Sequence, residues 1–588
     1  MRKSWTTGLG LLAMVAAGLS TVGGAAPAAA AGEAQEYVVL YRADASAEAA
    51  HRAIQAAAGT VVKENKAVGL ATVRSSNAHF LDQVAAQAAL EGAARSRPIG
   101  VAPTLRPKAQ DVEQVTAERQ AAAAAGTVAP KVASAAAGAS AAAGASAAPG
   151  AVTAEPLASL QWDMAMIRAT ASESYAVQPG DKRVTVGIMD TGVDGSHPDI
   201  APNFNSALSR NFTTDIPLID GPCDQEPDHS CSDPANVDEN GHGTHVAGII
   251  GAALNGLGIA GVAPGVTLVN LRAGQDSGFF FLQSTVDALT YAGDNGIDVV
   301  NMSFFTDPWL YNCAANPADS PAEQLEQRTI IAATQRALDY AHNKGVTLVA
   351  ALGNENTDIG HPTVDSTSPD FPPGTERTRT VDNSCLDMPV EGHNVIGVSS
   401  VGPSTNKADY SNYGLEQNDV SAPGGFFRDF AGTPRNRTVD NLILSAYPES
   451  LARANGQLDA NGVPNTPFVV RDCEQGVCAY YQYLQGTSMA SPHAAGVAAL
   501  IVSRLGLLDF RNPQRGLTFP PSAVEAVLKA TATGHFCPSP PLISYANVGR
   551  GPDYDALCIG GPKLNSIWGN GIVDALGAVT LRPRLPIP

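Results

Sequence analysis

The stretch RVTVGIMDTGVDGSHPDI, residues 183 to 200, begins with an apolar run that ends abruptly at Asp190. A short apolar run closed by turn residues is typical of a strand buried on both faces of a sheet. Similar runs recur at 266–272, 297–303 and 345–352, and they alternate with helical stretches such as THVAGIIGAAL and RTIIAATQRALDYAHNKG. This alternation predicts an α/β domain, a parallel sheet flanked by helices on both faces. Sites in such sheets lie at the carboxyl ends of the strands.

The composition of the 588-residue chain is that of a globular protein. Hydrophobic residues make up 44% of it and charged residues 16%, and the formal net charge is -19. Nucleic acid is not expected as a partner, because phosphate binding requires clustered lysine and arginine.

The first 31 residues are predicted to be a secretory signal peptide. Arg2 and Lys3 precede the apolar run GLGLLAMVAAGLS, and APAAAAG provides small residues for cleavage. The sequence shows no later uninterrupted apolar stretch of about 18 to 20 residues. We therefore expect a mature protein that is secreted, extracellular and not bound to a membrane.

The cysteines indicate disulfides. All eight follow residue 200, and an even number in an oxidising compartment favours structural bridges over a redox role or a metal site. Close spacing predicts the pairs Cys223–Cys231 and Cys473–Cys478. The pairing of the other four cysteines stays open.

A small domain is expected ahead of the α/β domain. Residues 36–102 alternate strand-like and helical stretches in an order that fits a ferredoxin-like βαββαβ unit of the α+β class. Residues 103–154 are rich in Ala, Gly, Ser and Pro and are predicted to be a flexible or cleavable linker. The α/β domain is expected to span residues 155–585.

Three residue types needed for acyl transfer lie where elements are expected to begin or end. Asp190 ends a strand, His242 begins a helix rich in small residues, and Ser488 begins another in QGTSMASPHAAGVAAL, with Pro492 expected in its first turn. Taken singly, Asp190 is more often a turn or cap residue and His242 a core or cap histidine. Together they meet a chemical need, because a serine nucleophile requires a base and that base requires an orienting acid.

Two further points concern the same chemistry. The negative charge that develops during attack on a carbonyl needs preorganised donors, and Asn354, after a strand in LVAALGNEN, can join the N–H of Ser488 in that role. A turn residue is the common alternative for an Asn after Gly. A zinc site at His242 and His245 is the weaker interpretation, because no Glu lies between them as in HExxH and no third ligand is evident.

The stretches MDTGVDGSHPD, NGHGTHVAG, ALGNEN and GTSMASPHAAG resemble the signature stretches of the subtilisin-like serine proteases, the peptidase S8 family, and occur in that family's order. The resemblance implies Asp190 as orienting acid, His242 as general base and acid, Ser488 as nucleophile and Asn354 as oxyanion donor. Residues 36–102 similarly resemble the family's inhibitory propeptide of the I9 type. That resemblance implies a domain that assists folding and occupies the cleft until it is removed.

Substrate contacts are expected in two segments that flank the substrate in this family, here DSGFFFLQS and NMSFFTDPWLYNC. The residues expected to bind substrate are Gly278, Phe280, Ser303, Phe305 and Gly353. Phe280 and Phe305 stand where the family usually has small residues. They either narrow the substrate pockets or pack elsewhere as core residues of a longer loop.

The resemblance also implies a structural calcium held by Asp199 and by a loop that contains Asn255. That loop is about one residue shorter than the family pattern, which alters the cavity that oxygen ligands would form. The acidic insertion at 215–240 is expected to be a solvated loop held by a disulfide, with an ion site as the alternative.

The sequence thus predicts a secreted, monomeric serine endopeptidase made as a self-inhibited precursor. Its partners would be protein or peptide substrates and its own propeptide, and its chemistry would need no cofactor. Two alternatives remain: a catalytically idle binding protein on the same fold, and an esterase or amidase acting on small substrates.

Overall fold

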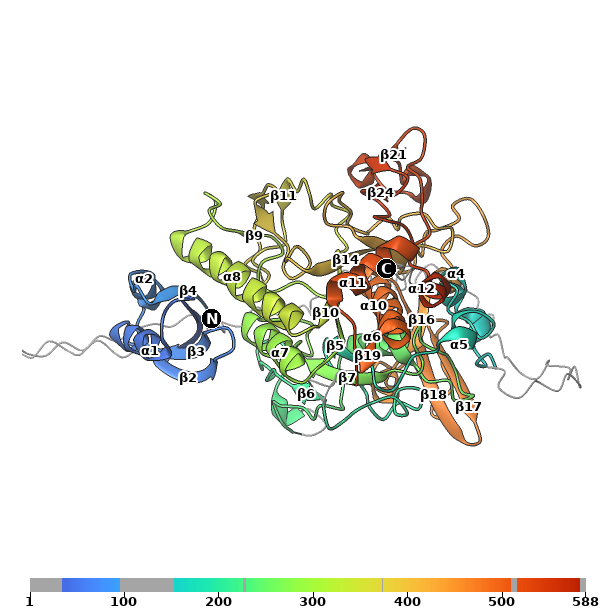
Figure 1. Ribbon diagram of the computed structural model, residues 1–588, viewed down its shortest axis with the longest axis horizontal. Coiled ribbons are helices and arrows are strands. Elements are labelled where there is room, and N and C mark those ends of the chain that lie inside the picture. Colours follow the sequence, from blue (N-terminus) through green and yellow to red (C-terminus); the bar gives the residue numbers. More distant parts are fainter. Residues whose placement is uncertain (1–33, 96–152, 226–228, 373, 509–515, 582–588) are drawn as a thin grey trace, which may run out of the picture.

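The computed structural model describes residues 34–95, 153–225, 229–372, 374–508 and 516–581. The predicted signal peptide, residues 96–102 of the predicted small domain, the linker up to residue 152 and residues 582–585 lie outside this described part. Figure 1 shows a small N-terminal domain, in blue, beside a larger α/β body.

A seven-stranded parallel sheet forms the centre of the body, in the order β15-β14-β10-β8-β5-β7-β6. Its strands are almost entirely buried, which explains why they appear in the sequence as continuous apolar runs rather than alternating ones. The strands are β5 (Thr185–Met189), β6 (Arg210–Asn211), β7 (Thr267–Arg272), β8 (Val299–Met302), β10 (Thr347–Ala351), β14 (Val395–Val401) and β15 (Val420–Pro423).

Helices cover both faces of this sheet, as the sequence predicts. Alternate residues of one strand enter different cores, because successive side chains of a strand point to opposite faces. Ile188 packs with α6 and α10, whereas Met189 packs with α7 and α8. The helices of the body are α4 (Trp162–Met166), α5 (Ser174–Val177), α6 (His242–Gly251), α7 (Leu282–Asp294), α8 (Pro321–Asn343), α9 (Glu449–Ala454), α10 (Thr487–Leu505), α11 (Pro521–Thr531) and α12 (Ala575–Thr580).

The central strands end together. Met189 of β5 pairs with Met302 of β8, and Met302 pairs with Ala350 of β10. The residues that follow these strands, Asp190 and Ser303 among them, therefore leave the sheet at one edge. This is the edge at which α/β proteins place their sites.

Antiparallel additions extend the body beyond the predicted alternation of strands and helices. The largest is a three-stranded sheet in the order β16-β18-β17, with bounds β16 (Ile443–Ala446), β17 (Val469–Glu474) and β18 (Val477–Leu484). Short two-stranded ladders pair β9 (Asn312–Cys313) with β13 (Cys385–Leu386), β11 (Val364–Asp365) with β12 (Arg379–Thr380), β19 (Leu507–Leu508) with β20 (Leu517–Thr518), β21 (Leu542–Ile543) with β22 (Ala556–Leu557), and β23 (Gly560–Gly561) with β24 (Leu564–Asn565).

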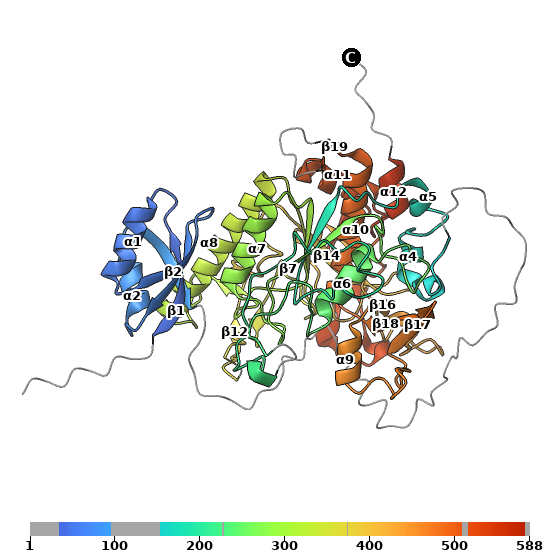
Figure 2. The same cartoon turned by 90° about the horizontal axis from the view of Figure 1, so that it is seen from below.

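The N-terminal domain has the predicted βαββαβ order. Its antiparallel sheet, in the order β2-β3-β1-β4, packs against α7 and α8 of the body (Figures 1 and 2). Gly92 allows the close approach, since a Cβ there would lie 2.2 Å from Thr329 Oγ1 of α8. The elements are β1 (Gln35–Tyr41), α1 (Ala47–Ala56), β2 (Thr60–Asn65), β3 (Leu70–Ser75), α2 (Phe80–Ala85) and β4 (Leu90–Arg95).

Four disulfides link all eight cysteines. The predicted pairs Cys223–Cys231 and Cys473–Cys478 are confirmed. The pairs that the sequence left open are Cys313–Cys385, which joins β9 to β13, and Cys537–Cys558.

Candidate active site

Asp190 and His242 form a buried pair. The carboxylate Oδ1 of Asp190 lies 2.7 Å from Nδ1 of His242 and also accepts the N–H of Thr191 at 2.8 Å. Because the carboxylate can only accept, the proton of a neutral imidazole lies on Nδ1, and Nε2 is the basic nitrogen. The side chains of both residues are buried.

Helix α6 begins at His242, and two local features hold this start against the end of β5. A Cβ on Gly243 would lie 2.0 Å from the carbonyl oxygen of Gly192, so only glycine permits this approach. Asp238 holds the backbone at this start: its Oδ1 accepts the N–H of Gly241 at 2.9 Å, and its Oδ2 accepts the N–H of Thr244 at 2.9 Å. Asp238 was not singled out in the sequence, because it lies four residues before the helix and not at the N-cap position, which Gly241 occupies.

Ser488 is the second residue of α10. Its hydroxyl donates to the carbonyl oxygen of Ser303, which follows β8, across 3.3 Å, a long distance for an O–H···O bond. The Ser303 hydroxyl donates in return to the carbonyl oxygen of Ser488 at 3.2 Å.

The expectation that Pro492 lies in the first turn of this helix is wrong, because Pro492 is the sixth residue of α10. A proline there has no N–H to donate to the carbonyl four residues earlier, which is that of Ser488. The hydroxyl of Ser303 takes the place of that missing donor. Pro492 therefore leaves the carbonyl of Ser488 free to accept a hydrogen bond from Ser303, at the end of β8.

The amide of Asn354 has a fixed orientation. Its Oδ1 accepts the N–H of Thr487 at 2.9 Å and the hydroxyl of Thr487 at 3.0 Å. The amide nitrogen is consequently the group that Asn354 presents to the pocket beside Ser488, whose lining includes both residues. Gly353 precedes it with φ +98°, a conformation that glycine adopts without strain.

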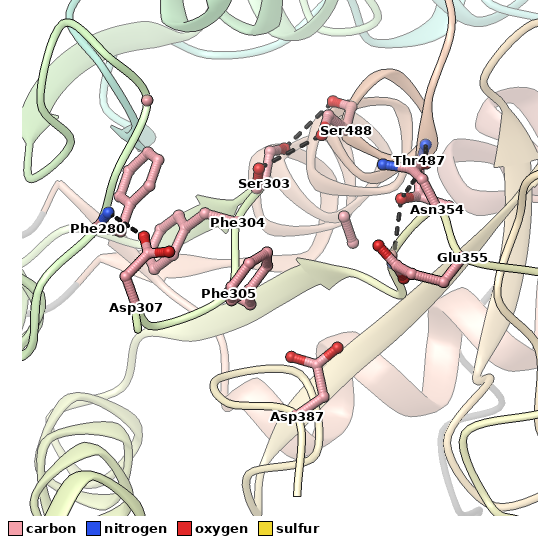
Figure 3. Close-up of a pocket in the computed structure, with 13 residues that line it drawn as sticks. Phe280, Ser303, Phe304, Phe305, Asp307, Asn354, Glu355, Asp387, Thr487 and Ser488 are labelled. Carbon is pink, nitrogen blue, oxygen red and sulfur yellow. Dashed lines mark hydrogen bonds between the residues drawn. The ribbon is translucent and has the colours of Figure 1, made fainter. Parts of the chain in front are cut away.

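One pocket brings together all five residues predicted to bind substrate, as well as Ser488 and Asn354 (Figure 3). Sequence reasoning missed Phe304, Asp307, Ala351, Glu355, Asp387 and Thr487, which also line this pocket. Glu355 and Thr487 adjoin predicted residues and could have been inferred from position. Asp387 is an acid in a loop without a motif, and it offered no signal.

Phe280 and Phe305 were expected either to narrow the substrate pockets or to pack as core residues, and in the structure they do both. Phe280 lines the pocket and is also buried in the core, where its ring stacks on Phe304 with centroids 4.0 Å apart. Phe305 lines the pocket and packs against the same core. Both side chains therefore give the pocket an apolar wall.

Asp199 and Asn255, the residues expected to hold calcium, are in contact. Asn255, however, faces the Asp199 carboxylate with its amide nitrogen and not with its oxygen. Asn255 Nδ2 donates to Asp199 Oδ1 at 3.1 Å, while Asn255 Oδ1 accepts the N–H of Leu257 at 2.9 Å. The hydroxyl of Tyr481 donates to Asp199 Oδ2 at 2.6 Å, and burial raises the pKa of Asp199 to about 7. Calcium would require the amide oxygen to turn toward the carboxylate, so this site stays a prediction.

A second acidic group lies in and beside the 215–240 insertion. Carboxylate oxygens of Asp215, Asp233 and Asp276 lie within 4.8 Å of one another, a donor set of the class that binds calcium. The buried guanidinium of Arg272 contacts all three carboxylates. Burial raises the pKa of Asp276 to about 8, even though Arg272 acts in the opposite direction.

A parallel α/β sheet, a buried Asp–His pair and a serine at a helix start beside an oriented amide define the class of serine hydrolases that use a Ser-His-Asp arrangement. The profile of the subtilase family, Peptidase S8, matches residues 181–571, and the chain belongs to this family.

Two proteases are each identical to this chain at 29% of the aligned residues. It is 29% identical over 356 residues to the nisin leader peptide-processing serine protease NisP of Lactococcus lactis subsp. lactis, a match covering 60% of this chain and 45% of that protein. It is 29% identical over 326 residues to subtilisin DY of Bacillus licheniformis, covering 55% of this chain and 79% of that protein.

Among solved structures, the epidermin leader peptide processing serine protease EpiP from Staphylococcus aureus matches with a TM-score of 0.57 and 20% identity, covering 94% of this chain and 99% of that one. This likeness supports the fold. Within the described ranges, no helix has both the length and the apolar character needed to cross a membrane.

Proposed function

We propose that the chain is a serine endopeptidase that hydrolyses peptide bonds through an acyl-enzyme on Ser488. The observation that supports this most directly is the 2.7 Å contact between Asp190 and His242 in a body where Ser488 and Asn354 line one pocket. Helices α6 and α10, which begin at or next to His242 and Ser488, pack against each other.

The proposed steps follow from the orientation of these groups. Ser488 Oγ attacks the carbonyl carbon of the substrate while His242 Nε2 takes its proton, and Asp190 stabilises the resulting imidazolium. The oxyanion accepts hydrogen bonds from Asn354 Nδ2 and from the N–H of Ser488. His242 then gives the proton to the leaving amine. A water, deprotonated by His242, attacks the acyl carbon, and His242 returns that proton to Ser488 Oγ as the acyl group leaves. These steps use no cofactor.

We also propose that residues 36–102 inhibit the precursor and that the mature enzyme is secreted. The small domain packs on α7 and α8, and Arg95, its last described residue, lines a second pocket together with Phe281 and Pro308. These two residues adjoin Phe280 and Asp307 of the first pocket. Arg95 thus lies next to the proposed substrate site.

The first test compares secreted wild-type protein with Ser488→Ala by mass spectrometry. We expect the wild type to be trimmed within residues 103–160 and the variant to retain its N-terminal domain. Identical termini in both proteins would contradict self-processing.

A fluorophosphonate label and a protein substrate separate the alternatives. A protease reacts with the label at Ser488 and cuts the protein, whereas an esterase or amidase reacts but leaves the protein intact. An idle binding protein does neither, which would overturn the proposed chemistry.

A further inference from the structure

The pocket at Ser488 and Asn354 is acidic. A carbonyl held between these two residues would direct the side chain of its own residue, on the acyl side of the cleaved bond, into this pocket. Asp307, Glu355 and Asp387 all line it, and among its described lining residues there is no lysine or arginine. Figure 3 shows the Asp387 carboxylate facing the same space as Phe305 and Glu355.

The carboxylate of Asp387 is nearly sealed from solvent, with 3% of the residue exposed. Its Oδ1 has no hydrogen-bond partner among the described residues. A buried carboxylate oxygen without a partner is costly, and the group gains most from a ligand that supplies hydrogen-bond donors or a positive charge.

The surroundings of Asp387 supply further negative charge. Burial, assisted by the acids Glu391, Glu355 and Asp365, raises the pKa of Asp387 well above its usual range. The Asp365 carboxylate is already paired with Arg379, and Glu355 accepts from the amide of Asn412 at 2.7 Å. A bound cation would relieve this repulsion and favour the ionised form of Asp387.

The other walls suit a long apolar stem. Phe280, Phe304 and Phe305 line the pocket together with Ala351, and Gly353 adds no side chain. Lysine and arginine carry a polar head on such a stem, which packs well along aromatic surfaces.

We propose that this enzyme cleaves after arginine or lysine, with the cationic head of that residue bound by the buried Asp387 carboxylate. This inference rests on the proposed function and adds the substrate class. It identifies Asp387 as the residue that determines specificity in the pocket.

The site of self-processing gives an independent test of this specificity. Between residues 96 and 167 the basic residues are Arg97, Arg106, Lys108, Arg119 and Lys131, and prolines follow Arg97 and Arg106. The rigid proline ring disfavours an acyl–proline bond as a substrate. Self-processing after a basic residue therefore predicts a new N-terminus at Ala109, Gln120 or Val132.

The main test compares kcat/KM for two peptide anilides that differ only in arginine or leucine before the cleaved bond. Wild type should prefer arginine. Asp387→Asn keeps the shape of the side chain and removes its charge, so kcat/KM for the arginine substrate should fall about 30-fold or more relative to that for the leucine substrate. Asp382→Asn, an exposed acid in the same segment, is the matched control and should leave the ratio unchanged.

The outcomes separate this inference from the proposed function. Cleavage of the leucine substrate in preference to arginine, together with fluorophosphonate labelling, would overturn the specificity and leave the protease assignment intact. Absence of both labelling and cleavage would overturn the protease assignment itself. If Asp387→Asn does not fold, the wild-type ratio and the mapped N-terminus still decide: an N-terminus not preceded by a basic residue contradicts the inference.

Discussion

At the scale of single residues, the orientation of the Asn354 amide makes a direct prediction. Because Thr487 engages Oδ1 through two hydrogen bonds, Nδ2 is the group directed to the developing oxyanion. Asn354→Leu should lower kcat by about 10²- to 10³-fold, the magnitude known for the loss of one such donor in subtilisin. Steady-state kinetics on a peptide anilide should show KM little changed, and fluorophosphonate labelling should persist. A loss confined to KM would contradict the assigned role.

Arg272 is a second residue with a predictable effect. Its fully buried guanidinium contacts Asp215, Asp233 and Asp276, so its removal takes away the cation that these three adjacent acidic groups share. Arg272→Met, made in the Ser488→Ala background to prevent autolysis, should lower the free energy of unfolding by about 3–5 kcal/mol. Denaturant unfolding measures this loss.

The effect of added calcium on stability tests whether the cluster of Asp215, Asp233 and Asp276 binds this ion. If the three carboxylates bind calcium once the guanidinium is gone, millimolar calcium should restore part of the lost stability in Arg272→Met and add less to the parent. Unchanged stability in both proteins would show that the cluster does not bind calcium under these conditions.

Site residues at the predicted start or end of a helix or strand could be identified from the sequence, whereas a site residue in a loop without a motif could not. Asp190 and Ser488 stand at element boundaries that local composition marks. Asp387 becomes part of the pocket only because β13, tied to β9 through Cys313–Cys385, brings the loop that follows it to the end of the central sheet. A position that depends on such long-range contacts produces no recognisable pattern of residues in the sequence.

At the scale of elements, a histidine in helix α6 makes the free energy of unfolding depend on pH. His245 is buried, its Nε2 lies 3.0 Å from the carbonyl oxygen of Gln482, and burial lowers its pKa to about 3. The unfolded chain binds a proton there near pH 6.5, whereas the folded chain does not until near pH 3. Stability from this group is therefore present above pH 6.5 and is lost as the pH falls toward 3.

The slope of this loss is measurable. One proton taken up on unfolding changes the free energy of unfolding by up to about 1.4 kcal/mol per pH unit. Denaturant unfolding of the Ser488→Ala protein between pH 4 and 7 should be steeper than that of the same protein with His245→Gln. Equal slopes would contradict a neutral buried His245.

The central elements were predictable because their burial produces continuous apolar runs, as in Thr185–Met189. The antiparallel sheet β16-β18-β17 was not predicted. Its strand β17 has polar, partly exposed residues and therefore lacks the continuous apolar run that marks the central strands. The position of Pro492 was wrong for a related reason. Local rules confine proline to a first turn, whereas here the distant Ser303 compensates for the missing N–H.

At the scale of the whole molecule, the small domain lies beside α7 and α8 (Figure 2). Apolar residues of the domain share one core with these helices, and polar contacts accompany them. Lys63 Nζ lies 2.6 Å from an Asp287 carboxylate oxygen. Asn65 Nδ2 donates to Asp287 at 2.8 Å and to Thr290 Oγ1 at 2.7 Å. These contacts should set how long the small domain remains bound after the chain is cut.

The last prediction uses changes that the mature enzyme would not contain. Lys63→Ala with Asn65→Ala should weaken retention of the small domain by about 5- to 30-fold, since Lys63 is half exposed and the net value of such contacts is only about 1–2 kcal/mol. Size-exclusion chromatography after processing should show more of the body free of the small domain, with higher activity per titrated active site before separation. Lys66→Ala is the control, because Lys66 is exposed and its recorded acidic neighbour, Glu64, belongs to its own domain. Equal retention in the double variant and the control would mean that the contacts of Lys63 and Asn65 do not hold the domain in place, and that the apolar centre and the remaining polar contacts, such as Arg336 with Glu91, hold it instead.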